Sequence, residues 1–299
     1  MAAPIRTEVI DANGLVFETD ICGDGPKFAL LLHGFPETKH SWRHQLPMLA
    51  ELGYTVWAPN LRGYGQSSRP EGIANYHIDK LTADVAGLID AKGASETLLI
   101  AHDWGGLIAW TFAIKNLRPL SALIEMNIPH PACMNRELRG SWSQRLKSWY
   151  ALFFQIPSLP EWALTRNGAA AIRRAFTDMA VDKSRFTDSD TQPFVENALR
   201  PGGMTAMLNY YRAAFRAGIE AYSPGDGRVA ARTLLIWGEN DTALGKPASY
   251  GTHNYVPDVT IRYLPGVSHW VQQEAPETVN AMIKAFLAGV PVPEASALR

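Results

Sequence analysis

The chain has 299 residues, of which 46% are hydrophobic and 10% aromatic, so it can bury a large core in one domain with room for an insertion. Its formal net charge is -1 at pH 7, and no long run of like charge gives an electrostatic footprint for nucleic acid or an anionic membrane. We therefore expect small neutral molecules as partners, with no nucleic acid and no membrane.

The two cysteines, Cys22 and Cys133, stand far apart and outside the spacings typical of metal ligands or redox pairs. This predicts reduced thiols and a cytoplasmic location. The opening residues, MAAPIRTEVIDANG, have no apolar region typical of a signal peptide, and no later stretch approaches the roughly 18 apolar residues of a membrane helix. We expect neither export by a signal peptide nor a membrane span.

In chain order, the first elements are the segments TEVIDA and LVFETD around Asn13-Gly14, which predict an antiparallel hairpin at a sheet edge. Six short apolar runs follow, and their continuous apolar pattern predicts strands buried on both faces of a parallel sheet. These runs cover residues 27–33, 55–60, 96–102, 120–127, 232–238 and 259–265. Helical patterns that end at glycine, at 77–93 and 277–289, are expected to flank the sheet. The sequence therefore predicts an α/β fold with a mostly parallel central sheet.

The alternation of strands and helices stops near Pro131 and resumes after Gly227. Between these points helical patterns dominate and aromatic residues are dense. We therefore divide the chain into a first part of the core, residues 1–130, an inserted helical cap, 131–227, and a second part of the core, 228–299. The C-terminal segment VPVPEASALR is expected to be a frayed tail.

Residues 101–106, with the sequence AHDWGG, pass from a strand through a sharp turn into a helix, with Asp103 at the apex. This is the layout of the nucleophile elbow, although aspartate is also a common helix cap. An aspartate that attacks a saturated carbon forms an alkyl ester that water can cleave, whereas an alkylated serine would be an inert ether. Asp103 therefore predicts an electrophilic sp³ carbon with an oxygen or halide leaving group, and argues against ordinary esterase or peptidase activity.

Two residues that each follow a strand could complete this chemistry. His269 could activate water, and Asp241 could orient that base, because catalytic groups gather at the carboxyl edge of a parallel sheet. Either residue alone would also fit an ordinary loop or turn, but the order Asp103, Asp241, His269 is the nucleophile, acid, base order of α/β-hydrolases. The loop after the first core strand, HGFP, could supply an oxyanion hole from the backbone N–H groups of Phe35 and Trp104.

The blocks HGFP, HDWGG, WGENDTAL and GVSHWVQQEAPE, with SWYALFFQIP and MLNYYR in the cap, resemble epoxide hydrolases of the α/β-hydrolase superfamily. The resemblance is closest to the soluble type and covers nearly the whole chain. It implies an α/β-hydrolase fold, no cofactor or metal, and hydrolysis of epoxides to vicinal diols through an ester on Asp103. It also implies that two cap tyrosines, Tyr150 and Tyr211, hold and protonate the epoxide oxygen.

Elementary chemistry agrees with that assignment, since the expelled alkoxide is a poor leaving group unless a phenol with a pKa of about 10 assists it. By composition alone the same tyrosines would be packing residues. The dense aromatic residues of the cap favour a small apolar epoxide, with water as the second substrate.

Two alternatives stay open. A haloalkane dehalogenase resembles the chain at the elbow and also places a tryptophan after the nucleophile, although Phe35 lacks the side-chain amide that some dehalogenases use as a halide donor. A ligand receptor built on a hydrolase fold could keep the triad, although the two cap tyrosines would be an unusual retention. The sequence specifies neither the natural epoxide nor the oligomeric state, and a homodimer remains an alternative.

Overall fold

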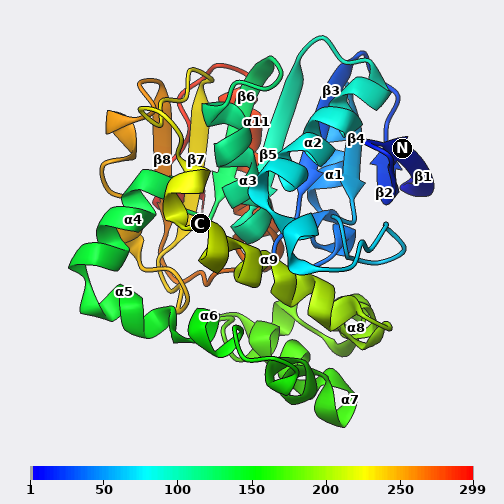
Figure 1. The fold of residues 1–299 in the computed structure, drawn as a ribbon. Helices are drawn as coiled ribbons and strands as arrows, with labels where there is room; N and C mark the ends of the chain where they lie inside the picture. The colour runs from blue at the N-terminus through cyan, green and yellow to red at the C-terminus, as the bar shows by residue number, and fades with distance from the viewer. Residues whose placement is uncertain (1–2, 299) are drawn as a thin grey trace.

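The computed structural model describes residues 3–298 and contains an eight-stranded sheet with the strand order β1-β2-β4-β3-β5-β6-β7-β8 (Figure 1). The strands are β1 Arg6–Ala12, β2 Leu15–Cys22, β3 Lys27–Leu32, β4 Tyr54–Pro59, β5 Thr97–His102, β6 Leu120–Met126, β7 Thr233–Gly238 and β8 Val259–Leu264. Strands β1 and β2 form the expected antiparallel hairpin, and β2 is antiparallel to β4. All other neighbours are parallel, so the prediction of a mostly parallel sheet is confirmed.

The hairpin turn and the buried strands follow from the local sequence. Asn13 and Gly14 both have positive φ, 51° and 72°, as a two-residue turn of type I′ requires. Every residue of β4, β5 and β7 is buried, because helices cover both faces of the sheet.

The core helices pack on opposite faces of the sheet. They are α1 Gln45–Glu51, α2 Ile78–Lys92, α3 Asp103–Ile114, α10 Val271–Glu274 and α11 Pro276–Leu287. Apolar residues of α2 and α3 join one hydrophobic cluster, and those of α1 and α11 join another. Alternate strand residues belong to different clusters: Leu30 and Leu32 face the first, and Ala29 and Leu31 face the second.

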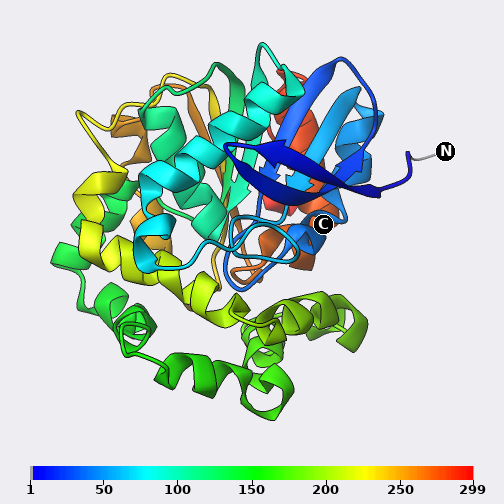
Figure 2. The same ribbon diagram turned by 45° about the vertical axis from the view of Figure 1, so that its right-hand side comes forward.

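Six helices lie between β6 and β7 and are called the cap helices here. They are α4 Pro131–Gly140, α5 Trp142–Lys147, α6 Trp149–Phe153, α7 Leu159–Thr177, α8 Asp188–Leu199 and α9 Gly203–Ala217. Figures 1 and 2 show that they extend over one end of the sheet. Helix α9 lies against the core, where the buried Tyr210 hydroxyl donates to the Arg62 carbonyl oxygen at 2.8 Å. Tyr210 therefore both packs in the core and forms a specific hydrogen bond.

The prediction of a frayed C-terminal tail is wrong for residues 290–298, the part of the tail that the structure describes. Val292 and Ala295 are each 7% exposed, and a short 3₁₀ helix covers Ala295–Leu298. The Arg262 guanidinium on β8 donates to the carbonyl oxygens of Val292 and Pro293 at 2.6 and 3.2 Å. Burial of small apolar side chains, together with these hydrogen bonds, orders the segment despite its prolines. The final residue, 299, lies outside the described residues.

Cys22 and Cys133 are both buried, free thiols. Within residues 3–298, every helix is too short or too polar to cross a membrane.

Candidate active site

Asp103 lies at a sharp turn between β5 and α3. Its φ is +50°, a left-handed conformation that costs an L-residue about 1–2 kcal/mol. Two glycines allow the close approach that this turn requires. A Cβ atom on Gly105 would lie 2.2 Å from the Leu32 carbonyl oxygen, and one on Gly34 would lie 2.4 Å from the Asp103 Cβ atom. The strained apex thus projects the carboxylate beyond the carboxyl edge of the sheet.

The structure brings the three residues of the expected triad together. The His269 Nδ1 atom lies 2.6 Å from the Asp241 Oδ2 atom, a hydrogen-bond distance. The Nε2 atom of the same ring lies 3.6 Å from the Asp103 Oδ2 atom. His269 is 3% exposed and Asp241 is also 3% exposed. The imidazole therefore stands between the two carboxylates in a site that is largely closed to solvent.

Asn127 is a site residue that the sequence analysis missed. Its side-chain amide donates to the Asp241 Oδ2 atom at 2.7 Å, and its Oδ1 atom accepts from the Gly238 N–H at 2.8 Å. The Asp241 Oδ1 atom accepts from the backbone N–H groups of Ala243 and Leu244 at 2.7 and 2.8 Å. Both oxygens of Asp241 are therefore fixed. The available signal was the position of Asn127 directly after β6, next to the strand that precedes Asp241.

The charges of the triad shift the pKa values of its members. Burial lowers the pKa of His269, but the negative charges and hydrogen bonds of Asp241 and Asp103 outweigh it and raise the value to about 10. Burial raises the pKa of Asp103, but hydrogen bonding and charge from His269 bring it below its usual value. Burial also raises the pKa of Asp241, but the charge and hydrogen bond of His269 and the hydrogen bond from the Leu244 N–H bring it below its usual value. The resting site thus favours an imidazolium between two carboxylates.

One of the two expected oxyanion donors already contacts the Asp103 carboxylate. The Phe35 N–H donates to the Asp103 Oδ1 atom at 2.8 Å. Trp104 is the second residue of α3, where a backbone N–H has no partner within the helix and points beyond its N-terminus. Positive electrostatic potential at this helix end favours an anion on Asp103.

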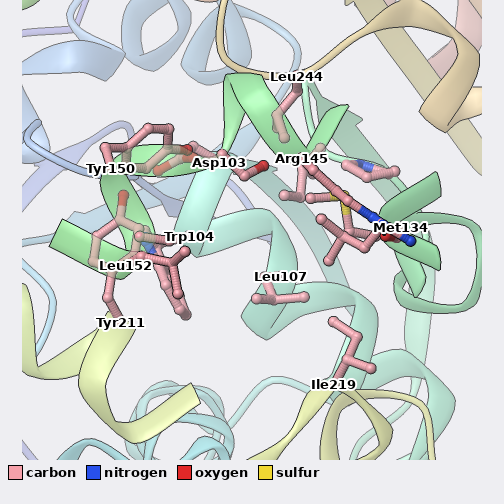
Figure 3. A pocket seen from close by; sticks show the side chains of 15 residues that line it. Asp103, Trp104, Leu107, Met134, Arg145, Tyr150, Leu152, Tyr211, Ile219 and Leu244 are labelled. Carbon is pink, nitrogen blue, oxygen red and sulfur yellow. Dashed lines mark hydrogen bonds between the residues drawn. The ribbon is translucent and has the colours of Figure 1, made fainter. Parts of the chain in front are cut away.

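Tyr150 on α6 and Tyr211 on α9 reach the same site from two cap helices (Figure 3). Their ring centroids are 6.0 Å apart in an edge-to-face arrangement, and Tyr211 packs on Trp104 with centroids 4.8 Å apart. Burial raises the pKa of both phenols above 10, and the negative charge of Asp103 adds to the effect. Both tyrosines are therefore held in the protonated form.

These residues line two adjoining apolar cavities. One, of about 420 Å³, extends from Asp103 and both tyrosines past Leu107 and Met134 (Figure 3). The other, of about 190 Å³, contains His269 and also Asp103 and both tyrosines. Asp103, Tyr150 and Tyr211 therefore lie where the two cavities meet. A substrate with apolar groups on both sides of a small polar centre would fit this space.

A second missed residue, Glu37, lies beneath the site and is fully buried. Its Oε2 atom accepts from the Gly34 N–H at 2.8 Å and lies 2.7 Å from the His102 Nδ1 atom. Its Oε1 atom accepts from the side-chain amides of Gln272 and Gln273, each at 2.8 Å. Burial raises the pKa of Glu37, but His102 and the Gly34 N–H bring it below its usual value. The sequence carried a signal, since Glu37 directly follows the HGFP motif.

Within the described residues, no group of three or more histidine, cysteine and acidic side chains is arranged to hold a metal ion.

Comparison with known proteins agrees with this geometry. A family model described as the alpha/beta hydrolase fold matches residues 30–276. The AB hydrolase superfamily protein YfhM of Bacillus subtilis (strain 168) is 36% identical over 285 residues, which are 95% of this chain and 98% of that protein. Epoxide hydrolase 4 of Mus musculus is 36% identical over 284 residues, covering 93% of this chain and 78% of the relative.

Solved structures give the same result. The crystal structure of Bacillus megaterium epoxide hydrolase in complex with an inhibitor superposes with a TM-score of 0.85 at 32% identity, covering 94% of this chain and 100% of that one. The chain therefore belongs to the α/β hydrolase fold family, as a member of its epoxide hydrolases.

Proposed function

We propose that the protein hydrolyses epoxides to vicinal diols through a covalent ester on Asp103. The observation that carries this proposal is the placement of two protonated phenols, Tyr150 and Tyr211, beside the Asp103 carboxylate at the junction of two apolar cavities. The chain's similarity to epoxide hydrolases supports the same reaction.

In the first step, the Asp103 carboxylate attacks one oxirane carbon and forms a C–O bond. The bond from that carbon to the epoxide oxygen breaks, and its electron pair stays on the oxygen. Tyr150 and Tyr211 donate hydrogen bonds to this oxygen, and one of them supplies the proton that converts the alkoxide to a hydroxyl. The raised pKa of each phenol keeps the proton in place until the alkoxide forms.

Ester formation changes the state of His269. The negative charge of Asp103 disappears on alkylation, and with it one of the interactions that raise the pKa of His269. The imidazole then loses its extra proton more readily, and this proton restores the phenol that gave its own to the alkoxide. The neutral ring is then free to accept a proton from water. Asp241 remains hydrogen-bonded to the ring and holds it in position through this step.

In the second step, the activated water attacks the ester carbonyl carbon of Asp103. The resulting oxyanion accepts hydrogen bonds from the backbone N–H groups of Phe35 and Trp104. The bond between the carbonyl carbon and the alkyl oxygen then breaks, and the leaving oxygen takes the proton that remains on the oxygen added from water. The diol therefore leaves with an oxygen that belonged to Asp103. The oxygen from water remains in the regenerated carboxylate.

The substrate that fits best is a small epoxide with alkyl or aryl substituents, since the cavities are lined mainly by apolar side chains. We assign residues 131–227 to a cap whose role is to deliver the two phenols and enclose the substrate. A halide leaving group would use N–H donors and would have no need of two buried hydroxyl groups, which favours the epoxide over a haloalkane.

The test is a parallel assay of terminal and aryl epoxides and of haloalkanes with matched substituents, scoring diol and halide release. An Asp103→Ala variant serves as the blank. We expect diol without halide, and no diol above background in the variant. Halide release would instead support the dehalogenase alternative, and no product from either class would support a receptor.

A further inference from the structure

The outer side of the cap exposes an unusual run of large apolar side chains. Figures 1 and 2 show α5, α6 and α7 following one another along the edge of the molecule farthest from the sheet. Seven exposed side chains lie on these helices and their connections, and they define what is called the cap surface below: Trp142, Leu146, Trp149, Leu152, Ile156, Leu159 and Trp162. Three of the seven are tryptophans, exposed by 76%, 62% and 57% in chain order. Because these side chains do not pack in the protein core, such a cluster indicates a surface that binds another molecule.

The charges around the cap surface are mostly positive. Residues 139–177 contain six basic residues and a single acidic one, Glu161. Glu161 is neutralised by Arg212, whose guanidinium donates to both of its oxygens at 2.7 and 3.1 Å. Arg139 and Arg173 pair with carboxylates, whereas the four other basic side chains form no ion pair within residues 3–298. The segment therefore carries a net positive charge although the whole chain is close to neutral.

Arginine and tryptophan side chains are also combined in space on this surface. The Arg145 guanidinium carbon lies 5.0 Å from the centroid of the Trp142 ring, and that of Arg166 lies 4.9 Å from the Trp162 ring. Tryptophan prefers the boundary between lipid chains and water, and arginine binds the phosphate groups found there. Such pairs suit an interface that offers apolar chains and anionic head groups side by side.

We propose that the cap surface docks the protein onto membranes that contain anionic lipid. The charge pattern favours this occupant over a second copy of the chain. In a symmetric dimer formed through this surface, the uncompensated basic residues of one copy would face those of the other. Anionic lipid instead complements them, and the exposed tryptophan and leucine side chains enter the interfacial region.

The position of the larger cavity gives the docking a consequence for substrate access. Arg145 on α5 and Leu152 on α6 line that cavity and are also exposed, so we infer that the cavity reaches the molecular surface next to the cap surface. A lipophilic epoxide dissolved in the bilayer would enter the cavity without crossing bulk water. This part of the inference rests on the proposed epoxide hydrolysis.

The docking proposal departs from the expectation of no membrane partner, which rested on the net charge of -1. Net charge averages over the whole molecule, whereas a membrane contacts only one face of it. Four of the basic residues in 139–177 have no ion-pair partner within residues 3–298, and the acidic residues of the cap other than Glu161 lie outside this segment.

Vesicle flotation tests the docking directly. The full-length protein is mixed with vesicles of phosphatidylcholine alone or with phosphatidylserine added, at low and at high salt. The test variant is Trp142→Ser/Trp149→Ser/Trp162→Ser, none of which lines either active-site cavity. The matched control is Val9→Ser/Val290→Ser, which removes two exposed apolar side chains from the core instead. A charge variant, Arg166→Glu/Arg174→Glu, tests the electrostatic part.

We expect the wild type and the control to float with the anionic vesicles at low salt. The tryptophan and charge variants should bind at least tenfold more weakly, and high salt should release the wild type. Equal flotation of the tryptophan variant and the control, or no flotation of the wild type, would overturn the proposal. So would a dimer, detected by sedimentation, that the tryptophan substitutions dissociate, because a second copy would then cover this surface.

An activity measurement separates this inference from the proposed function. Diol release is measured from 1,2-epoxybutane in solution and from 1,2-epoxyhexadecane in anionic vesicles. The tryptophan variant should keep its rate on the soluble epoxide and lose at least fivefold on the vesicle-bound one. If the tryptophan variant matched the wild-type rate on both the soluble and the vesicle-bound epoxide, delivery from the membrane would be refuted and epoxide hydrolysis would stand. Flotation without turnover of either epoxide would refute the proposed function and leave the docking surface standing.

Discussion

The His102 Nδ1 atom lies 2.7 Å from the Oε2 atom of Glu37, and both side chains are fully buried. The other ring nitrogen of His102, Nε2, donates to the carbonyl oxygen of His269 at 2.9 Å. Oxygen atoms of two other segments therefore hold both ring nitrogens of His102. The pair joins the loop that carries Phe35, the turn that carries Asp103 and the loop that carries His269.

Replacing Glu37 with glutamine should therefore weaken both folding and turnover. The substitution presents an amide where four donors converge and leaves a buried donor without an acceptor, which should cost about 3 kcal/mol of unfolding free energy. Displacement of the His269 backbone should lower kcat more than it raises KM. Urea unfolding and steady-state kinetics measure the two effects. The control is Glu239→Gln, which removes a partly exposed ion pair with Lys246 and should cost at most about 1 kcal/mol. Equal losses of unfolding free energy and of kcat in Glu37→Gln and Glu239→Gln would contradict the role assigned to the Glu37–His102 pair.

The elements of the fold and the residues of the site differ in how well the sequence predicts them. The strands, the hairpin and the helical region follow from local apolar periodicity and turn residues, which act over a few residues. Asp103 is marked by its position in a strand, turn and helix unit. Asn127 and Glu37 are not, because each acts through contacts with segments more than 60 residues away in the chain. An asparagine after a strand looks the same whether it holds Asp241 or caps a turn.

Tail composition misled the sequence analysis for a related reason. Composition does not say where side chains lie in space. The two prolines near Val292 predict an extended chain, but whether an extended chain frays depends on a partner such as Arg262, which only the fold supplies.

Substituting His269 with glutamine should trap the covalent intermediate. Asp103 and both tyrosines remain, so alkylation proceeds, but no base is left to activate water for ester hydrolysis. Intact-protein mass spectrometry after exposure to an epoxide should show an increase equal to the mass of one epoxide. Peptide mapping should place it on Asp103. Blocked turnover without any adduct would contradict the two-step scheme, and an Asp103→Ala/His269→Gln double variant provides the unlabelled control.

Removing the two phenolic hydroxyl groups should slow alkylation without disturbing the fold. Tyr150→Phe and Tyr211→Phe keep the rings that pack on each other and on Trp104. The free energy of unfolding, measured in urea, should therefore change by less than about 1 kcal/mol. Each single variant should lose roughly 10²-fold in the rate of ester formation, the lower range for loss of a general acid. The double variant should lose more than either. Tyr210→Phe is the matched control, because its hydroxyl binds the Arg62 carbonyl oxygen outside the cavity. Unchanged ester formation in the double variant would refute the proton-donor assignment.

The titration of His269 should depend on the charge of Asp103. Asp103→Asn removes a negative charge 3.6 Å from the imidazole, so the pKa of His269 should fall below its value of about 10 in the wild type. NMR titration of the histidine ring resonances measures this change, with the exposed Asp226→Asn variant as control. An unchanged His269 pKa in Asp103→Asn would contradict the release of the proton on alkylation.

The same titration affects stability with a definite sign. Because the pKa of His269 is raised in the folded state, its contribution to the unfolding free energy is fully present below about pH 6.5 and is lost as the pH rises through about 10. The wild type should therefore lose more stability than Asp103→Asn between pH 7 and pH 10, as measured by urea unfolding.

Glu125 offers a second test of buried charge, away from the catalytic residues. It lies on β6, is fully buried, and neither of its carboxyl oxygens has a hydrogen-bond partner within residues 3–298. Burial raises the pKa of this carboxyl well above its usual value. Relative to the unfolded chain, its contribution to stability is therefore present below about pH 4.5 and declines as the pH rises, because only the unfolded state ionises freely.

Glu125→Gln keeps the shape of the side chain and removes its ionisation. The stability of the variant relative to the wild type should therefore increase with pH, by up to about 1.4 kcal/mol per pH unit above pH 4.5. Urea unfolding at pH 5, 6.5 and 8 measures the trend, and Glu71→Gln, at an exposed position, should show none. A difference between Glu125→Gln and the wild type that stays constant across this range would mean that Glu125 ionises in the folded protein and has found a partner. The direction of the trend, more than its size, decides the matter, because it reports which of the two states binds the extra proton.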